Sequence, residues 1–125
     1  MLTLFKNAQV YSPEFMGKKD VLVGGTTILS IQDKIEMPAT IDLKLINCEG
    51  LWLLPGLIDS HVHITGGGGE GGPASRMSEL TIDMMIEGGV TTVIGCLGTD
   101  GFTRTVESVL MKVKSIRAAG LSAWM

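Results

Sequence analysis

His61 and His63 are the only two histidines in the chain, and one residue separates them. Side chains two residues apart on a β-strand point to the same face, about 6–7 Å apart along the strand. Two neutral imidazoles at that spacing can bind one borderline-soft divalent cation such as Zn²⁺. Asp59 shares this face one step earlier, where its carboxylate could orient a histidine or approach the metal. The alternative is a pair of histidines satisfied by ordinary hydrogen bonds.

A glycine-rich stretch, residues 66–72, follows the histidines and carries one carboxylate, Glu70. Glycine lets the backbone approach a ligand closely, and one carboxylate among glycines suits a small cationic group such as an ammonium. The stretch lacks the Gly-Lys-Ser/Thr ending of a phosphate-binding loop. A solvated charge on a flexible linker is the alternative for Glu70. Thr99, in a Gly-Thr-Asp-Gly loop, is either a substrate contact or a turn-forming hydroxyl.

Strands and helices alternate in the part of the chain that must position these residues. The pattern predicts strands over 57–63, 90–96 and 121–125, and helices over 77–87 and 104–119. This order is typical of βα units on a parallel sheet, an α/β fold in which active sites gather at the carboxyl ends of the strands. A complete (β/α)₈ barrel needs about 250 residues. We therefore expect residues 55–125 to be the first βα units of an incomplete (β/α)₈ barrel, in the N-terminal part of a larger protein.

Residues 1–54 carry short β signals and no long helical period. Two apolar runs, 21–23 and 28–31, flank a glycine pair and predict a β-hairpin. Further strands are expected over 43–46 and 51–54. We interpret this part as a small antiparallel sheet or half-sandwich, a β-sandwich subdomain that precedes the barrel units and carries no chemistry.

The composition excludes several classes of protein. Ten Lys and Arg residues against 13 Asp and Glu residues give a net charge of −3, which argues against nucleic acid or an anionic membrane as a partner. Apolar residues make up 45% of the chain and charged residues 18%, so the chain is not disordered. Cys48 and Cys96 are too few for a disulfide scaffold and are expected to be reduced in a core. No signal peptide or membrane-spanning stretch is recognised, and we expect a cytoplasmic protein.

The segment 55–63, Pro-Gly-Leu-Ile-Asp-Ser-His-Val-His, resembles the opening motif of the amidohydrolase superfamily. Four further stretches resemble one branch of that superfamily, the isoaspartyl dipeptidases. They are residues 66–73, 88–93, 97–100 and 122–125. The His-x-His element is shared across the superfamily, whereas the glycine run with Glu70 and the Leu-Gly-Thr-Asp loop are more specific. The resemblance covers nearly the whole chain and is strongest after residue 50.

The resemblance implies a (β/α)₈ barrel with a small β-sandwich, two zinc ions, and hydrolysis of the β-aspartyl bond of dipeptides. It implies that His61 and His63 bind the more buried zinc, that Glu70 pairs with the free α-amino group of the substrate, and that Gly68 and Thr99 help to hold the substrate. In the family, the remaining metal ligands and the catalytic base lie on later strands, so no catalytic residue is assigned here. The 125-residue chain alone is therefore expected to be inactive. The complete enzyme is expected to be a homo-oligomer.

Two other interpretations stay open. The chain could belong to another amidohydrolase, such as a cyclic-amide hydrolase or a deacetylase, although the glycine run with Glu70 favours a dipeptidase. It could also be a non-catalytic fragment or interaction module that keeps the start of the fold without its chemistry. The sequence that follows Met125 distinguishes these cases, since an enzyme requires further histidines and an aspartate at later strand ends.

Overall fold

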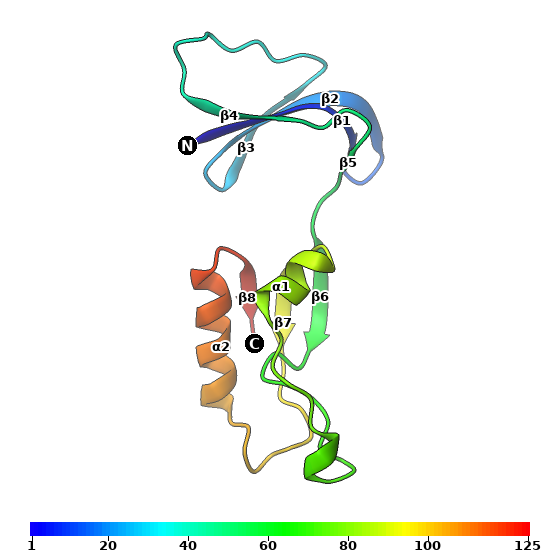
Figure 1. Ribbon diagram of the computed structural model, residues 1–125, viewed down its shortest axis with the longest axis vertical. Coiled ribbons are helices and arrows are strands. Elements are labelled where there is room, and N and C mark those ends of the chain that lie inside the picture. The colour runs from blue at the N-terminus through cyan, green and yellow to red at the C-terminus, as the bar shows by residue number, and fades with distance from the viewer. The chain divides into compact units, whose positions relative to one another are not determined.

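The computed structural model describes residues 1–125, which form two compact units, Met1–Pro55 and Gly56–Met125 (Figure 1). The first unit contains only strands and loops, and the second contains strands and helices. The chain is thus a mixed α/β protein with a small β-rich N-terminal unit.

The N-terminal unit is one five-stranded sheet with the order β3-β2-β1-β4, in which β5 also pairs with β1. Its strands are β1 (Leu2–Tyr11), β2 (Phe15–Gly24), β3 (Thr27–Gln32), β4 (Leu43–Asn47) and β5 (Trp52–Leu53). The predicted hairpin is confirmed, because β2 and β3 pair antiparallel and Gly24 lies opposite Thr27 across a two-residue turn.

The prediction of a small antiparallel sheet holds only in part for this unit. β4 and β5 both pair parallel to β1, as two short pieces along the same strand, so the sheet is mixed. The strands form one sheet rather than two packed layers. The sequence pattern does not reveal the long strand β1, since Lys6 and Asn7 interrupt its apolar residues.

A buried carboxylate, Asp20, stabilises an irregular point of β1. Asn7 has a left-handed φ of 62° at a register shift of this strand, and its backbone N–H donates to Asp20 Oδ1 at 2.9 Å. The backbone N–H of Ile35 donates to Oδ2, also at 2.9 Å. Burial opposes the ionisation of Asp20, but these two donors and the nearby Lys6 ammonium hold the pKa of its carboxyl below the ordinary value.

We expect Asp20→Asn to lower the stability of this unit by about 1–3 kcal/mol at neutral pH, because an amide cannot accept both backbone N–H groups. Since folding lowers the pKa of Asp20, its ionised form contributes stability that is present above the ordinary pKa of about 3.9 and is lost as the pH falls through the folded-state value. The difference between wild type and variant should therefore shrink in acid. Thermal unfolding followed by circular dichroism at pH ~7 and pH ~3 checks this.

Asp33→Asn is the matched control, because the Asp33 side chain is exposed and pairs only with a surface lysine. If Asp20→Asn destabilises the protein equally at both pH values, the ionised form of Asp20 does not contribute the predicted stability.

The C-terminal unit is built on a parallel sheet with the order β6-β7-β8. Its elements are β6 (Leu57–Val62), the 3₁₀ turn η1 (Pro73–Ser75), α1 (Ile82–Glu87), β7 (Val90–Gly95), α2 (Val106–Ala118) and β8 (Ser122–Trp124). The predicted alternation of three strands with two helices is confirmed. Buried residues of α2, Val109, Val113 and Ile116, pack with Val93 of β7 and Ala123 of β8 into one core, and α2 runs beside the sheet (Figure 1).

The first helix is shorter than the predicted span 77–87. Its N-cap is Thr81, whose hydroxyl accepts a hydrogen bond from the backbone N–H of Met84. The residues before Thr81 form hydrogen bonds outside the helix. The backbone N–H of Met77 donates to the Gly67 carbonyl, and the backbone N–H of Leu80 donates to the Ile64 carbonyl. Backbone hydrogen bonds to Ile64 and Gly67 therefore replace the first turn of the expected helix.

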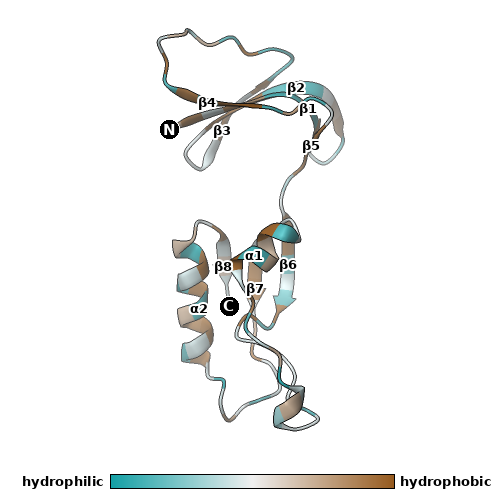
Figure 2. Ribbon diagram, in the orientation of Figure 1, coloured by the Kyte–Doolittle hydropathy of each residue, from teal (hydrophilic) through white to brown (hydrophobic).

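The parallel sheet places the carboxyl ends of β6 and β7 at one edge. β6 changes from apolar to hydrophilic toward that end (Figure 2). None of the helices combines the length and the apolar character that crossing a lipid bilayer requires.

Candidate metal and substrate site

Three donor side chains meet where β6 and β7 end. His61 belongs to β6, His63 follows it directly, and Cys96 follows β7. The two imidazole rings lie 5.6 Å apart and nearly perpendicular, and one donor atom from each of the three residues lies within 4.8 Å of the others. The edge of parallel strands thus brings together the predicted histidine pair and a cysteine that the sequence pattern assigns to a core.

The chemistry of this donor set fits a divalent metal ion. Imidazole nitrogen and thiolate sulfur are the ligands that zinc prefers in proteins. His61 is exposed and His63 is half-buried, so the site is open to solvent on one side. Nδ1 of His63 lies 3.5 Å from the carbonyl oxygen and 3.4 Å from the sulfur of Cys96, which restricts the orientation of the ring.

Asp59 is not one of the clustered donors. Its Oδ1 accepts a hydrogen bond of 3.1 Å from the backbone N–H of His61. The carboxylate therefore orients the backbone that carries the histidine, and neither of the two roles considered from the sequence describes this contact.

The glycine-rich loop folds tightly against the segment that precedes α1. Gly66 and Gly68 have left-handed φ angles of 93° and 69°. A Cβ atom at Gly66 would lie 2.4 Å from the Met77 carbonyl oxygen, and one at Gly68 would lie 2.2 Å from the Ser75 carbonyl oxygen. Only glycine is compatible with both the angle and the space at these positions.

A buried guanidinium, Arg104, holds this loop in place. Its side chain is bound by three backbone carbonyls: Nε donates to Thr65 at 3.1 Å, Nη1 to Gly68 at 3.3 Å, and Nη2 to Met77 at 3.1 Å. Arg104 is only 4% exposed. Sequence reasoning assigns it merely to the start of a helix, because backbone acceptors leave no signature in the residue types.

The three residues expected to contact substrate lie together. The hydroxyl of Thr99 is 2.8 Å from Glu70 Oε1 and 3.2 Å from the carbonyl oxygen of Gly68, so it can donate to either. The Glu70 side chain is exposed. Its own backbone N–H and the Thr99 hydroxyl hold the pKa of the Glu70 carboxyl below the ordinary value. This loop therefore presents an ionised carboxylate to solvent at neutral pH.

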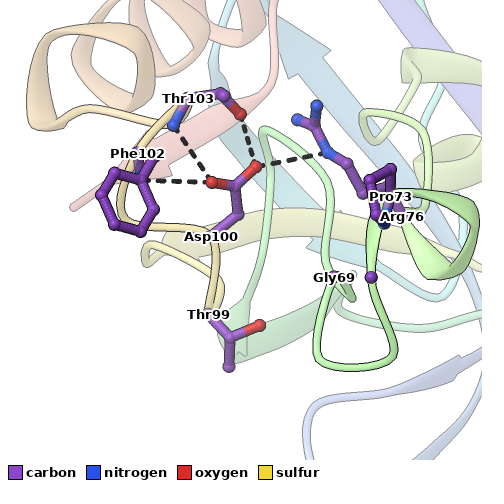
Figure 3. A pocket seen from close by; sticks show the side chains of 8 residues that line it. Gly69, Pro73, Arg76, Thr99, Asp100, Phe102 and Thr103 are labelled. Atoms are coloured by element: carbon purple, nitrogen blue, oxygen red, sulfur yellow. Dashed lines mark hydrogen bonds and ion pairs between the residues drawn. The ribbon is translucent and has the colours of Figure 1, made fainter.

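A cavity of about 380 Å³ opens beside Gly69 and Thr99. Arg76 and Asp100 lie on its wall, with Nε of Arg76 3.3 Å from Oδ2 of Asp100 (Figure 3). Asp100 also accepts hydrogen bonds from the backbone N–H groups of Phe102 and Thr103. Arg76 is an exposed residue and is paired with Asp100 at the edge of this cavity. A second cavity of about 270 Å³ is lined by His63 and Gly67 among others.

Comparison with known proteins identifies the relatives of this chain. No family model matches it. The crystal structure of the β-aspartyl dipeptidase from Fervidobacterium islandicum AW-1 is 48% identical over 98% of the chain and 34% of its own length, with a TM-score of 0.91. The same enzyme in complex with the β-Asp-Leu dipeptide superposes with a TM-score of 0.88.

Curated relatives include a dihydroorotase from Pediococcus pentosaceus, 32% identical over 96% of this chain and 27% of that protein. An imidazolonepropionase from Acidiphilium cryptum is 33% identical over 71% of this chain and 21% of that protein. These enzymes are amidohydrolases, as the dipeptidase is. Over nearly its whole length the chain is similar to members of the amidohydrolase superfamily. The resemblance seen in the sequence is thereby confirmed, and the chain spans about a third or less of the length of the relatives it matches.

Proposed function

We propose that the chain is the N-terminal part of a zinc-dependent isoaspartyl dipeptidase. The observation that carries the proposal is the similarity to the β-aspartyl dipeptidase of Fervidobacterium islandicum, at 48% identity over 98% of the chain. In this proposal β6, β7 and β8 are the first strands of a (β/α)₈ barrel. Residues 1–54 form one layer of a β-sandwich that later parts of the protein complete. A cytoplasmic location stays a prediction from the sequence.

His61 and His63 would hold one of the two expected zinc ions, with the Cys96 backbone restraining the His63 ring. A zinc ion bound there supplies Lewis-acid chemistry that polarises an amide carbonyl and lowers the pKa of water. Asp59 positions the backbone N–H of His61 and so limits the rotation of the segment that carries both imidazoles.

Glu70 favours a dipeptide over a cyclic amide as the substrate. A β-aspartyl dipeptide carries a free α-ammonium close to the bond that is cleaved, whereas a hydantoin or dihydroorotate ring carries none. The ionised Glu70 carboxylate suits such an ammonium through a charge-assisted hydrogen bond. Thr99 donates to the same carboxylate at 2.8 Å and so restricts its orientation. Gly68 allows close approach because it has no side chain.

The test is a substrate panel with the full-length protein and added zinc. We expect metal-dependent hydrolysis of β-aspartyl-leucine and little activity on α-aspartyl-leucine, dihydroorotate, hydantoin or an N-acetyl sugar. Preference for a cyclic amide supports the second interpretation, an amidohydrolase of the dihydroorotase kind, to which the Pediococcus relative is similar. Absence of hydrolysis across the panel supports the third, a non-catalytic module.

Glu70→Gln should raise the KM for β-aspartyl-leucine about tenfold or more while changing kcat less, because it removes the charge that binds the substrate ammonium. Glu87→Gln is the matched control, since Glu87 is an exposed carboxylate at the end of α1. Steady-state kinetics on both variants checks this. Equal KM values for the Glu70 variant and wild type exclude the contact.

The 125 residues produced alone should be inactive on β-aspartyl-leucine and should self-associate. Large apolar side chains of the parallel sheet are exposed, including Ile58 at 68% and Trp124 at 50%, and such surfaces aggregate when uncovered. Light scattering and calorimetry on the purified chain check this. A monodisperse monomer with one cooperative melting transition contradicts the assignment of these strands to an incomplete barrel. Metal-dependent turnover by the 125 residues contradicts the expectation that essential catalytic residues lie on later strands.

A further inference from the structure

We propose that Cys96 is a third protein donor to the metal ion bound by His61 and His63. The site would then favour thiophilic divalent cations such as zinc and cadmium over hard ones such as manganese. The inference rests on the proposed metal site and adds a ligand to it.

The sheet register places the cysteine at the site. Gly95 pairs with Val62 across β6 and β7, and the backbone N–H of Cys96 donates to the Val62 carbonyl at 3.0 Å. The residues on either side of this pair, His61 and His63 on one strand and Cys96 on the other, therefore emerge at the same edge. The juxtaposition follows from backbone pairing between strands, which holds the Cys96 Cα beside the histidines.

The distances suit a shared ion. Zinc–nitrogen bonds of about 2.0–2.1 Å and zinc–sulfur bonds of about 2.3 Å place the donors of one tetrahedral ion roughly 3.3–3.8 Å apart. The Cys96 sulfur lies 3.4 Å from Nδ1 of His63, so His63 would share the ion through this nitrogen in place of its 3.5 Å contact with the Cys96 carbonyl. The donor atoms of His61, His63 and Cys96 all lie within 4.8 Å of one another. Side-chain rotations that move these atoms by about 1 Å would bring them to the separations of a single tetrahedral ion.

The thiol is available for this role. Cys96 is a free cysteine and is half-buried rather than sealed in the core. Its other contact is a weak one, to the Val62 carbonyl oxygen at 3.6 Å. Two imidazoles and one thiolate make three protein donors from this chain, to which the expected ligands from later strands would add.

Cobalt substitution tests the proposal. Metal-free full-length protein is loaded with Co²⁺, and its absorption spectrum is recorded for wild type, Cys96→Ser and Cys96→Ala. We expect wild type to show a near-ultraviolet thiolate-to-cobalt charge-transfer band. Both variants should lose that band and keep the visible cobalt bands of histidine coordination. Cys48→Ala is the control and should keep the near-ultraviolet band, because Cys48 packs in the core of the N-terminal sheet.

A competition titration supplies the second readout. Replacing the Cys96 thiol with a hydroxyl should lower cadmium affinity at least about tenfold and manganese affinity much less, because sulfur discriminates in favour of soft cations. A wild-type spectrum without the charge-transfer band, or a Cys96→Ala spectrum that retains it, overturns the proposal. So does an equal loss of affinity for both ions.

The same preparations are assayed on β-aspartyl-leucine, so that the two proposals fail separately. Hydrolysis without the charge-transfer band removes Cys96 from the metal site and leaves the dipeptidase intact. A charge-transfer band without hydrolysis establishes Cys96 as a metal ligand and contradicts the proposed dipeptidase function.

Discussion

Replacing either His61 or His63 by alanine in the full-length protein is expected to lower both the bound zinc and the rate of β-aspartyl dipeptide hydrolysis by at least about 100-fold. Even the hydrogen-bond partners of metal ligands are worth 10–100-fold in affinity or activity, and a ligand contributes more than its partner. The two rings lie 5.6 Å apart at the end of β6, so the loss of either removes one of the imidazole donors that converge on the ion.

Metal content by elemental analysis and turnover of β-aspartyl-leucine measure the two effects. Ser60→Ala is the matched control, because Ser60 directly precedes His61 in sequence and projects from the opposite face of the strand. Undiminished zinc content in both histidine variants contradicts the assignment of the site.

The second large effect is expected at Arg104. Arg104→Lys should lower the free energy of unfolding by about 3 kcal/mol, because an ammonium cannot reach all three carbonyl groups that the guanidinium now binds. The carbonyls of Thr65, Gly68 and Met77 then lose their charged donor in a buried position. The glycine-rich loop that carries Glu70 loosens as a result, so the KM for the dipeptide should rise as well.

Urea unfolding of the full-length protein and steady-state kinetics measure these two consequences. Arg117→Lys is the comparison, since the Arg117 guanidinium has one backbone acceptor, the Ala123 carbonyl at 2.7 Å, and lies over the Trp124 ring. Its replacement should cost about 1 kcal/mol and leave KM unchanged. If Arg104→Lys is no more disruptive than Arg117→Lys, the loop is held by other contacts.

The local pattern of residues was enough to predict much of the C-terminal unit. Alternation over 57–63 placed both imidazoles on one face of a strand, and β-branched residues over 90–96 indicated the neighbouring strand. The buried residues of α2, Val109, Val113 and Ile116, recur at helical spacing. These features have periods of two or 3.6 residues, and such periods are visible within a single stretch of sequence.

Local residue patterns could not predict the contacts between residues that lie far apart in the chain. β4 and β5 pair parallel to β1, which no local pattern specifies. Cys96 reaches His63 across 33 residues, and Arg104 binds a carbonyl 39 residues earlier. The acceptors of Arg104 are main-chain oxygens, which every residue type carries. Tertiary packing therefore determines the strand order of the N-terminal sheet. It also determines the position of Cys96 beside the histidines and the binding of the Arg104 guanidinium to the glycine-rich loop.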